Sequence, residues 1–123
     1  MLLKYMELVV YSLENCYYSM SAEDFLNENY VDKKNKKTYR LQRVNQENKM
    51  SYKEYNKMNT FPQIFLESSN DKIKIGGYND LKEIVGILKN KKNKKNNFDD
   101  ILSKLNSRYD KRDALVLIKF FIQ

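Results

Sequence analysis

The chain has 123 residues, of which 41% are hydrophobic, a length and composition that suit one domain with a modest core. Its single cysteine, Cys16, excludes an intramolecular disulfide, and its first residues lack the apolar run of a signal peptide, so we expect a cytoplasmic protein. Lysines cluster in two Lys/Asn-rich stretches, residues 33–37 and 89–95, that are typical of solvated loops, so the net charge of +7 does not predict a specific nucleic-acid partner.

The first two predicted elements flank Cys16. Residues 6–11 are apolar and β-branched, which predicts a buried strand that leads to the cysteine. From Tyr18 onward, apolar and small residues recur at helical spacing, which predicts an amphipathic helix beginning near Cys16. Free backbone N–H groups and the positive end of the helix dipole favour a thiolate at such a position, so Cys16 is the candidate nucleophile.

Further elements follow along the chain. Residues 39–44 alternate in polarity with period two and predict a strand, and residues 51–58 can form two helical turns. Residues 61–66 and 72–75 are strand-like runs separated by turn-forming residues, which predicts a hairpin. A helix is expected from Tyr78 onward, so the predicted order is βαβαββα in an α/β fold.

The rest of the chain is predicted to form a linker and an extension. Residues 90–97 are rich in lysine and asparagine, which indicates a linker between a domain at residues 1–89 and a carboxy-terminal extension at residues 98–123. We expect the extension to be helical, although its final apolar run, residues 114–122, fits either a strand or a helix. Lys119 interrupts this run, which is far shorter than the roughly 20 residues that span a bilayer, so we expect no membrane span.

Redox chemistry is indicated by the segment Cys16-Tyr17-Tyr18-Ser19. It has the spacing of a Cys-x-x-Cys motif, with an oxygen in place of the second sulfur, so it cannot close an internal disulfide. The simpler alternative is that Cys16 is a small buried hydrophobic residue without reactivity.

Two loops carry further signals. Pro62, the only proline, lies at the entry to an apolar strand, which suggests a special geometry such as a cis peptide; an edge-strand proline in trans is an equal alternative. Gly76 and Gly77 directly precede a helix start, where backbone N–H groups can hold a carboxylate. The alternative for this segment is that Asn79 and Asp80 only cap the helix.

The ordered set of these motifs resembles the glutaredoxin family over residues 6–89. The matching pieces are a strand, Cys-x-Tyr-x, a helix, Thr-x-Pro-x-Ile-Phe, a hairpin and Ile-Gly-Gly-x-x-Asp-Leu before a last helix. The resemblance implies a glutaredoxin-like domain at residues 1–89 with a thioredoxin-like fold, in which helices flank a mixed four-stranded sheet. Within that family the chain would be a single-cysteine Cys-Tyr-Tyr-Ser variant.

The resemblance also implies a groove for glutathione beside Cys16, which takes the place of the family's nucleophile. The backbone of Phe61 would pair with the cysteinyl unit of glutathione, and Lys49 would contact its glycyl carboxylate. Leu13 departs from the family, because many members carry a lysine there for the same carboxylate. The implied glutathione-binding residues are Tyr18, Lys49, Thr60, Phe61, Pro62, Asn79 and Asp80.

Three functions are compatible with these features. The leading hypothesis is a monomeric glutathione-dependent thiol-disulfide oxidoreductase that reduces protein–glutathione mixed disulfides through Cys16 alone, by a monothiol mechanism. Its partners would be glutathione and glutathionylated or disulfide-bonded proteins. A second hypothesis is a carrier in which Cys16 and glutathione ligate a [2Fe-2S] cluster between two subunits, although the bulky Tyr17 disfavours it. A third is a non-catalytic thioredoxin-fold adaptor that binds partners through residues 98–123.

Overall fold

The computed structural model describes residues 6–89 and 97–122 of the chain. These residues divide into two compact units, one at Glu7–Leu81 and one that comprises the described residues from Lys82 onward together with Met6. The division falls before the domain end predicted at residue 89. Most of the predicted linker, residues 90–96, lies outside the described residues.

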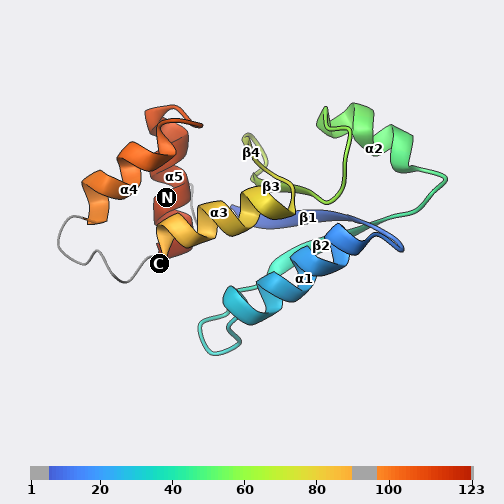
Figure 1. Cartoon of the computed structure of the whole chain (residues 1–123), viewed down its shortest axis with the longest axis horizontal. Helices are drawn as coiled ribbons and strands as arrows, with labels where there is room; N and C mark the ends of the chain where they lie inside the picture. The colour runs from blue at the N-terminus through green and yellow to red at the C-terminus, as the bar shows by residue number, and fades with distance from the viewer. Residues whose placement is uncertain (1–5, 90–96, 123) are drawn as a thin grey trace. The chain divides into compact units, whose positions relative to one another are not determined.

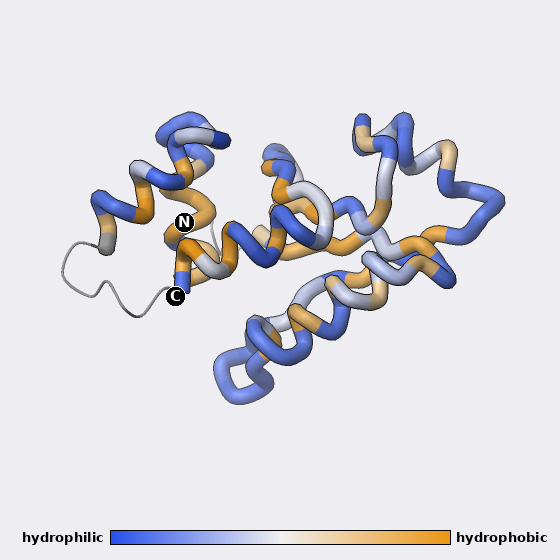
Figure 2. The backbone as a smooth tube through the Cα atoms, viewed as in Figure 1, coloured by the Kyte–Doolittle hydropathy of each residue, from blue (hydrophilic) through white to orange (hydrophobic). Residues whose placement is uncertain are grey.

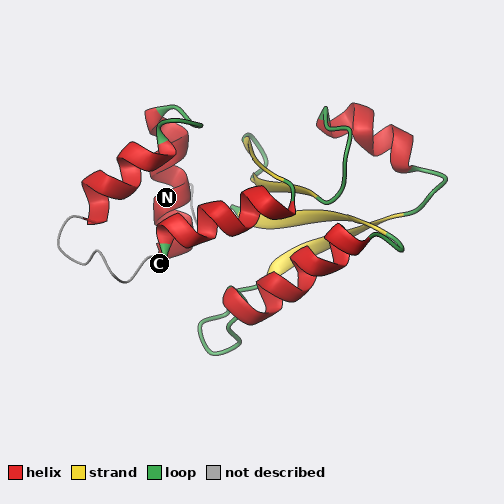
Figure 3. Ribbon diagram, viewed as in Figure 1, coloured by secondary structure: helices red, strands yellow, loops and turns green. Residues whose placement is uncertain are grey.

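The first unit contains one mixed four-stranded sheet in the order β2-β1-β3-β4 (Figures 1 and 3). β1 pairs in parallel with β2 and antiparallel with β3, and β3 pairs antiparallel with β4. This pairing confirms the predicted mixed four-stranded sheet. The strands are β1 (Glu7–Leu13), β2 (Tyr39–Val44), β3 (Gln63–Glu67) and β4 (Lys72–Gly76).

The two central strands carry the hydrophobic core of the sheet. Residues 8–12 of β1 and residues 63–66 of β3 are buried in unbroken runs, as expected for strands covered on both faces. Figure 2 colours this central part of the sheet mostly orange, for hydrophobic residues. β3 begins at Gln63, two residues later than the predicted strand at 61–66, because Pro62 has no N–H group to contribute to a strand ladder.

Two helices of the first unit pack on opposite faces of the sheet. Ser12 of β1 donates a hydrogen bond to Glu23 of α1, whereas the neighbouring Tyr11 contacts Tyr52 of α2 with ring centroids 5.5 Å apart. Because consecutive strand residues point to opposite faces, α1 and α2 cover different sides of β1. Their bounds are Tyr17–Asn29 for α1 and Lys49–Asn56 for α2.

α2 begins two residues before the predicted segment 51–58. The turn that precedes it is folded by side-chain amides, since Asn45 Oδ1 accepts hydrogen bonds from the N–H groups of Glu47 and Asn48, each 2.9 Å long. Such Asx turns start a helix through local polar contacts. Hydrophobic periodicity does not report these contacts, so it misplaced the helix start.

The described part of the second unit is helical. Its final run, which fitted either a strand or a helix, forms α5, because Ala114, Leu117, Ile118 and Phe121 lie on one buried helix face. Asp110 caps this helix by accepting a 2.8 Å hydrogen bond from the N–H of residue 113. No helix in the described ranges has the length and hydropathy needed to cross a bilayer. The bounds are Tyr78–Leu88 for α3, which crosses the division between the units, Asn97–Leu105 for α4 and Lys111–Ile122 for α5.

Candidate active site

Cys16 lies in the connection between β1 and α1, as predicted. It is the N-cap residue of α1, with extended backbone angles (φ −112°, ψ 120°), and its carbonyl accepts the N–H of Met20 at 3.0 Å. Asn15, with φ of +56°, turns the chain into the helix. The first turn of α1 contains no acidic side chain. The positive end of the helix dipole next to the half-buried thiol is therefore not offset within that turn.

The thiol of Cys16 faces the loop that precedes β3. The Phe61–Pro62 peptide is cis, which confirms the special geometry predicted for this proline. Cys16 Sγ lies 3.9 Å from the carbonyl oxygen of Phe61, within reach of a weak S–H hydrogen bond. Phe61 is buried, and its side chain belongs to the hydrophobic cluster against which Cys16 and Leu13 also pack. The fold thus brings together two predicted site residues that are 45 positions apart in sequence.

Ser19 occupies the place of the second sulfur in the Cys-x-x-Cys spacing. Its side chain is fully buried, and its hydroxyl oxygen accepts a 3.1 Å hydrogen bond from the N–H of Leu13. The hydroxyl therefore ties the last residue of β1 to the first turn of α1. In this chain the position is structural, and Cys16 is the only thiol at the site.

Aromatic rings adjoin the thiol on the α1 side. Tyr17 and Tyr18 follow Cys16 directly and have contacting rings, with centroids 5.3 Å apart. The ring of Tyr18 in turn lies 6.4 Å from that of Tyr78, the first residue of α3. Sequence reasoning selected Tyr18 but not Tyr78. The only available signal was that Tyr78 follows the glycine pair.

The glycine turn before α3 is organised by Asp80. The carboxylate of Asp80 accepts a 3.0 Å hydrogen bond from the N–H of Gly77, as in a capping box. Gly76 has φ of +121°, and a Cβ atom there would collide with the Asp80 side chain. These contacts correspond to the capping alternative for Asp80, and binding of glutathione by Asp80 and the exposed Asn79 stays a prediction.

We expect Gly76→Ala to lower the free energy of unfolding by about 1–3 kcal/mol, because alanine is strained at this positive φ and would displace the Asp80 carboxylate. Urea denaturation followed by circular dichroism measures the change. Gly86→Ala is the matched control, since the space around Gly86 is open and alanine should stabilise the interior of α3 by about 0.5–1 kcal/mol. Similar effects of the two substitutions would contradict this account of the turn.

The remaining predicted residues lie near the cis-proline loop or on α2. Thr60 is exposed immediately before Phe61. Lys49 is the first residue of α2, and no hydrogen bond or ion pair of its side chain is found within the described residues. α2 is joined to the thiol region by Tyr52, which packs on the same hydrophobic cluster as Cys16. The clamping role of Lys49 therefore stays a prediction.

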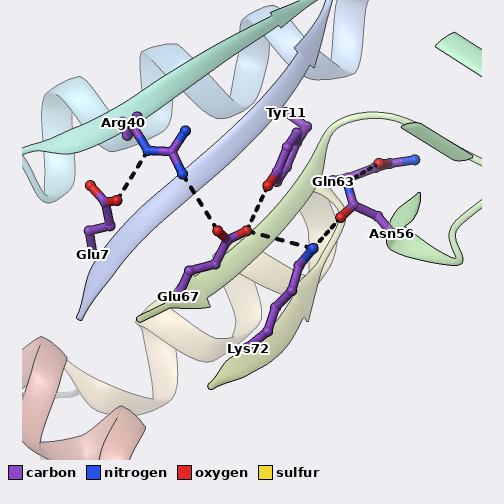
Figure 4. Close-up of polar contacts among 7 residues, drawn as sticks. All are labelled: Glu7, Tyr11, Arg40, Asn56, Gln63, Glu67 and Lys72. Carbon is purple, nitrogen blue, oxygen red and sulfur yellow. Dashed lines mark hydrogen bonds and ion pairs between the residues drawn. The ribbon is translucent and has the colours of Figure 1, made fainter. Parts of the chain in front are cut away.

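A buried amide network, which the sequence did not reveal, holds the strand that follows Pro62 (Figure 4). Gln63 is fully buried; its Oε1 accepts a 2.7 Å hydrogen bond from Asn56 Nδ2, and its Nε2 donates to the carbonyl of Met58 at 3.1 Å. Both partners come from the end of α2 and the loop after it. Gln63 therefore fixes the segment between α2 and the cis-proline, which carries the carbonyl facing Cys16.

The network continues into charged groups on the α2 side of the sheet (Figure 4). Lys72 Nζ donates to Asn56 Oδ1 at 2.5 Å and lies 3.9 Å from Glu67, which also accepts a 2.8 Å hydrogen bond from the hydroxyl of Tyr11. Burial, together with this hydrogen bond to the carboxylate, raises the pKa of Tyr11 well above its usual range. Burial lowers the pKa of Lys72, an effect that the charge of Glu67 opposes.

A cavity of about 550 Å³ lies beside this network. It contains neither Cys16 nor any of the predicted glutathione-binding residues, so it is distinct from the thiol site. Within the described ranges, no group of three or more His, Cys, Asp and Glu side chains is placed to hold a metal ion. The cavity is lined by Tyr11, Arg40, Gln42, Ser51, Tyr52, Tyr55 and Glu67.

A comparison with solved structures finds a protein with a similar fold. The fold is similar to that of glutaredoxin 1 from Francisella tularensis, known from a crystal structure of its complex with cacodylate. The two chains are 25% identical, the similarity covers 70% of this chain and 99% of that one, and the TM-score is 0.51. No protein-family model and no curated protein sequence matches the chain. The structural match shows a thioredoxin-like fold of the glutaredoxin kind and supports a place among the thiol oxidoreductases.

Proposed function

We propose that the protein is a glutathione-dependent thiol-disulfide oxidoreductase that reduces protein–glutathione mixed disulfides by a monothiol mechanism. One observation carries the proposal: the only thiol of the chain belongs to the N-cap residue of the first helix and lies 3.9 Å from the carbonyl oxygen of Phe61 in the cis-proline loop. A helix N-terminus favours the thiolate, which is the form that attacks disulfides. The buried Ser19 leaves no second thiol, so a cycle within one chain uses Cys16 alone.

In the first step the Cys16 thiolate attacks the glutathione sulfur of a mixed disulfide. The old S–S bond breaks, a new bond forms between Cys16 and glutathione, and the released protein thiolate takes up a proton. In the second step the thiolate of another glutathione attacks that glutathione sulfur. Glutathione disulfide leaves, and the Cys16 thiolate is regenerated. Overall, one protein–glutathione disulfide and one glutathione thiol become one protein thiol and one glutathione disulfide, so the disulfide is exchanged and no other oxidant or reductant takes part.

The residues around Cys16 would bind and orient glutathione rather than react. The backbone of Phe61, held by the cis peptide to Pro62, would pair with the cysteinyl unit, with Thr60 beside it. Tyr18 would line the groove. The γ-glutamyl end would lie near Asn79 and Asp80 at the start of α3, where helix N–H groups favour a carboxylate.

The direct test is glutathione-dependent turnover of the purified full chain. A glutathionylated model peptide is incubated with glutathione, and formation of glutathione disulfide is followed through glutathione reductase and NADPH. The proposal predicts turnover well above the uncatalysed exchange. Turnover at the uncatalysed rate, with a folded protein and a reduced thiol, would overturn it.

Lys49→Glu should raise the Michaelis constant for glutathione by roughly 3- to 10-fold and change turnover less, because a clamp on the glycyl carboxylate acts mainly on ground-state binding. Lys53→Glu on the same helix α2 is the matched control for the charge reversal. Steady-state kinetics with varied glutathione measures both constants. Equal constants for the wild type and Lys49→Glu would show that Lys49 does not contact the carboxylate.

A further inference from the structure

Exposed hydrophobic side chains gather immediately after Cys16. Tyr17 is 70% exposed, Tyr18 54% and Met20 52%. Residues 17–22 carry no charge, although charged residues make up 32% of the chain. An uncharged, aromatic helix turn open to solvent beside a reactive group is typical of a surface that binds a partner.

The aromatic side chains contact one another in succession. The ring of Tyr17 contacts that of Tyr18, the ring of Tyr18 contacts that of Tyr78, and the ring of Tyr78 contacts that of Phe25, with successive centroids 5.3, 6.4 and 6.4 Å apart. These four residues, here named the aromatic row, all belong to the first unit. Rings that already support one another lose little conformational entropy when a ligand binds.

We propose that the aromatic row is the docking surface for protein substrates. It would select mixed disulfides in which the glutathionylated cysteine is flanked by an aromatic or large aliphatic side chain. This inference rests on the proposed function, because a substrate must bring its disulfide to Cys16, and the row begins at the next residue. Tyrosine is among the residues that contribute most to binding energy at protein interfaces.

The spacing of the row fits an extended peptide. Side chains on one face of an extended strand recur about every 7 Å. This repeat is close to the 5.3–6.4 Å between successive rings of the row. An extended substrate segment of three residues can therefore place its cysteine at Cys16 and the apolar side chain two positions away on the rings. Glutathione has no such side chain, and Tyr17 is not among its predicted binding residues, so contact with Tyr17 distinguishes protein substrates from the reductant.

Two glutathionylated peptides test the inference, identical except for Phe or Ser two residues from the cysteine, the nearest position on the same face of an extended segment. The wild type should have a kcat/KM roughly 5- to 20-fold higher for the Phe peptide, mainly through KM. Tyr17→Ala should lower the value for the Phe peptide to that of the Ser peptide. The same variant should leave unchanged the values for the Ser peptide and for the mixed disulfide of glutathione and 2-mercaptoethanol.

Two controls separate ring contact from general damage. Tyr17→Phe keeps the ring and should retain the preference for the Phe peptide. Tyr55→Ala removes a tyrosine of similar exposure, 67%, from α2 and should leave the preference unchanged. A wild type that treats both peptides equally, or a Tyr17→Ala variant that loses the same fraction of activity on both, would overturn the inference.

A binding measurement tests the row even if the reductase assay fails. Fluorescence anisotropy with labelled peptides is measured on Cys16→Ser, which cannot react with the disulfide. The Phe peptide should bind more tightly than the Ser peptide, and adding Tyr17→Ala should remove the difference. Equal affinities would overturn the docking surface, whereas absent turnover with a retained difference would count only against the proposed function.

Discussion

Cys16→Ser should reduce glutathione-dependent turnover to the uncatalysed background. A serine hydroxyl is not ionised near neutral pH, and its oxygen cannot form the mixed disulfide with glutathione through which the monothiol route passes. The chain contains no other thiol that could take over the reaction. Mass spectrometry after exposure to glutathione disulfide should show one added glutathione on the wild type and none on the variant.

Ser19→Ala is the control for this result. Its hydroxyl accepts the N–H of Leu13, so alanine leaves a buried donor unpaired, and the free energy of unfolding should fall by about 1–3 kcal/mol. Turnover of the folded variant should remain near that of the wild type, because only the first position of the motif reacts. A loss of turnover in Ser19→Ala as complete as in Cys16→Ser would contradict the monothiol mechanism.

The largest effect on stability is expected from Gln63→Leu. Leucine is apolar and one atom shorter, so it leaves Asn56 Nδ2 and the Met58 carbonyl without their partner. Each buried polar group that loses its hydrogen bond costs about 1–3 kcal/mol, so the loss at both groups should lower the free energy of unfolding by about 2–6 kcal/mol. Urea denaturation at constant pH measures this change.

Gln42→Leu is the matched control for Gln63→Leu. Gln42 lies on the edge strand β2 and is only half-buried, and its amide makes one 3.3 Å hydrogen bond to the carbonyl of Arg43. Its replacement should change the free energy of unfolding by less than about 0.5 kcal/mol. If Gln63→Leu were equally mild, the amide network would not anchor the cis-proline segment.

Gln63→Leu should also alter the active site. Gln63 adjoins Pro62, and the carbonyl before that proline faces the thiol. A loosened loop should lower turnover of the folded variant under conditions in which Gln42→Leu retains full turnover. Gln63 acts as a positioning residue, so its effect should appear for peptide and small disulfide substrates alike.

Local sequence signals determined the order of the elements and the position of Cys16, the candidate nucleophile. The apolar run before Cys16 and the helical spacing after it placed the cysteine at the start of α1, because both signals lie within a few residues of the thiol. Pro62 at a strand entry indicated the cis peptide, since proline is the residue that tolerates this geometry. The glycine pair indicated the turn before α3, where Gly76 has a positive φ.

The tertiary structure decided what depends on residues far apart in the chain. The contacts of Tyr11 with Glu67 and of Lys72 with Asn56 arise from strand register and from the packing of α2, and no local pattern encodes either. A single glutamine within an apolar strand gave no sign of the partners that its burial requires.

The tertiary structure also determined the roles of Ser19 and Tyr78. Ser19 was expected only as a substitute for sulfur, but the fold uses its hydroxyl to join β1 to α1. Tyr78 belongs to the aromatic row because the packing of α3 near α1 places its ring next to that of Tyr18, which is 60 positions away in sequence. Hydrophobic periodicity indicates which residues of one helix or strand are buried. A functional site contains side chains from several helices and strands. Tertiary packing determines which of these side chains lie in contact.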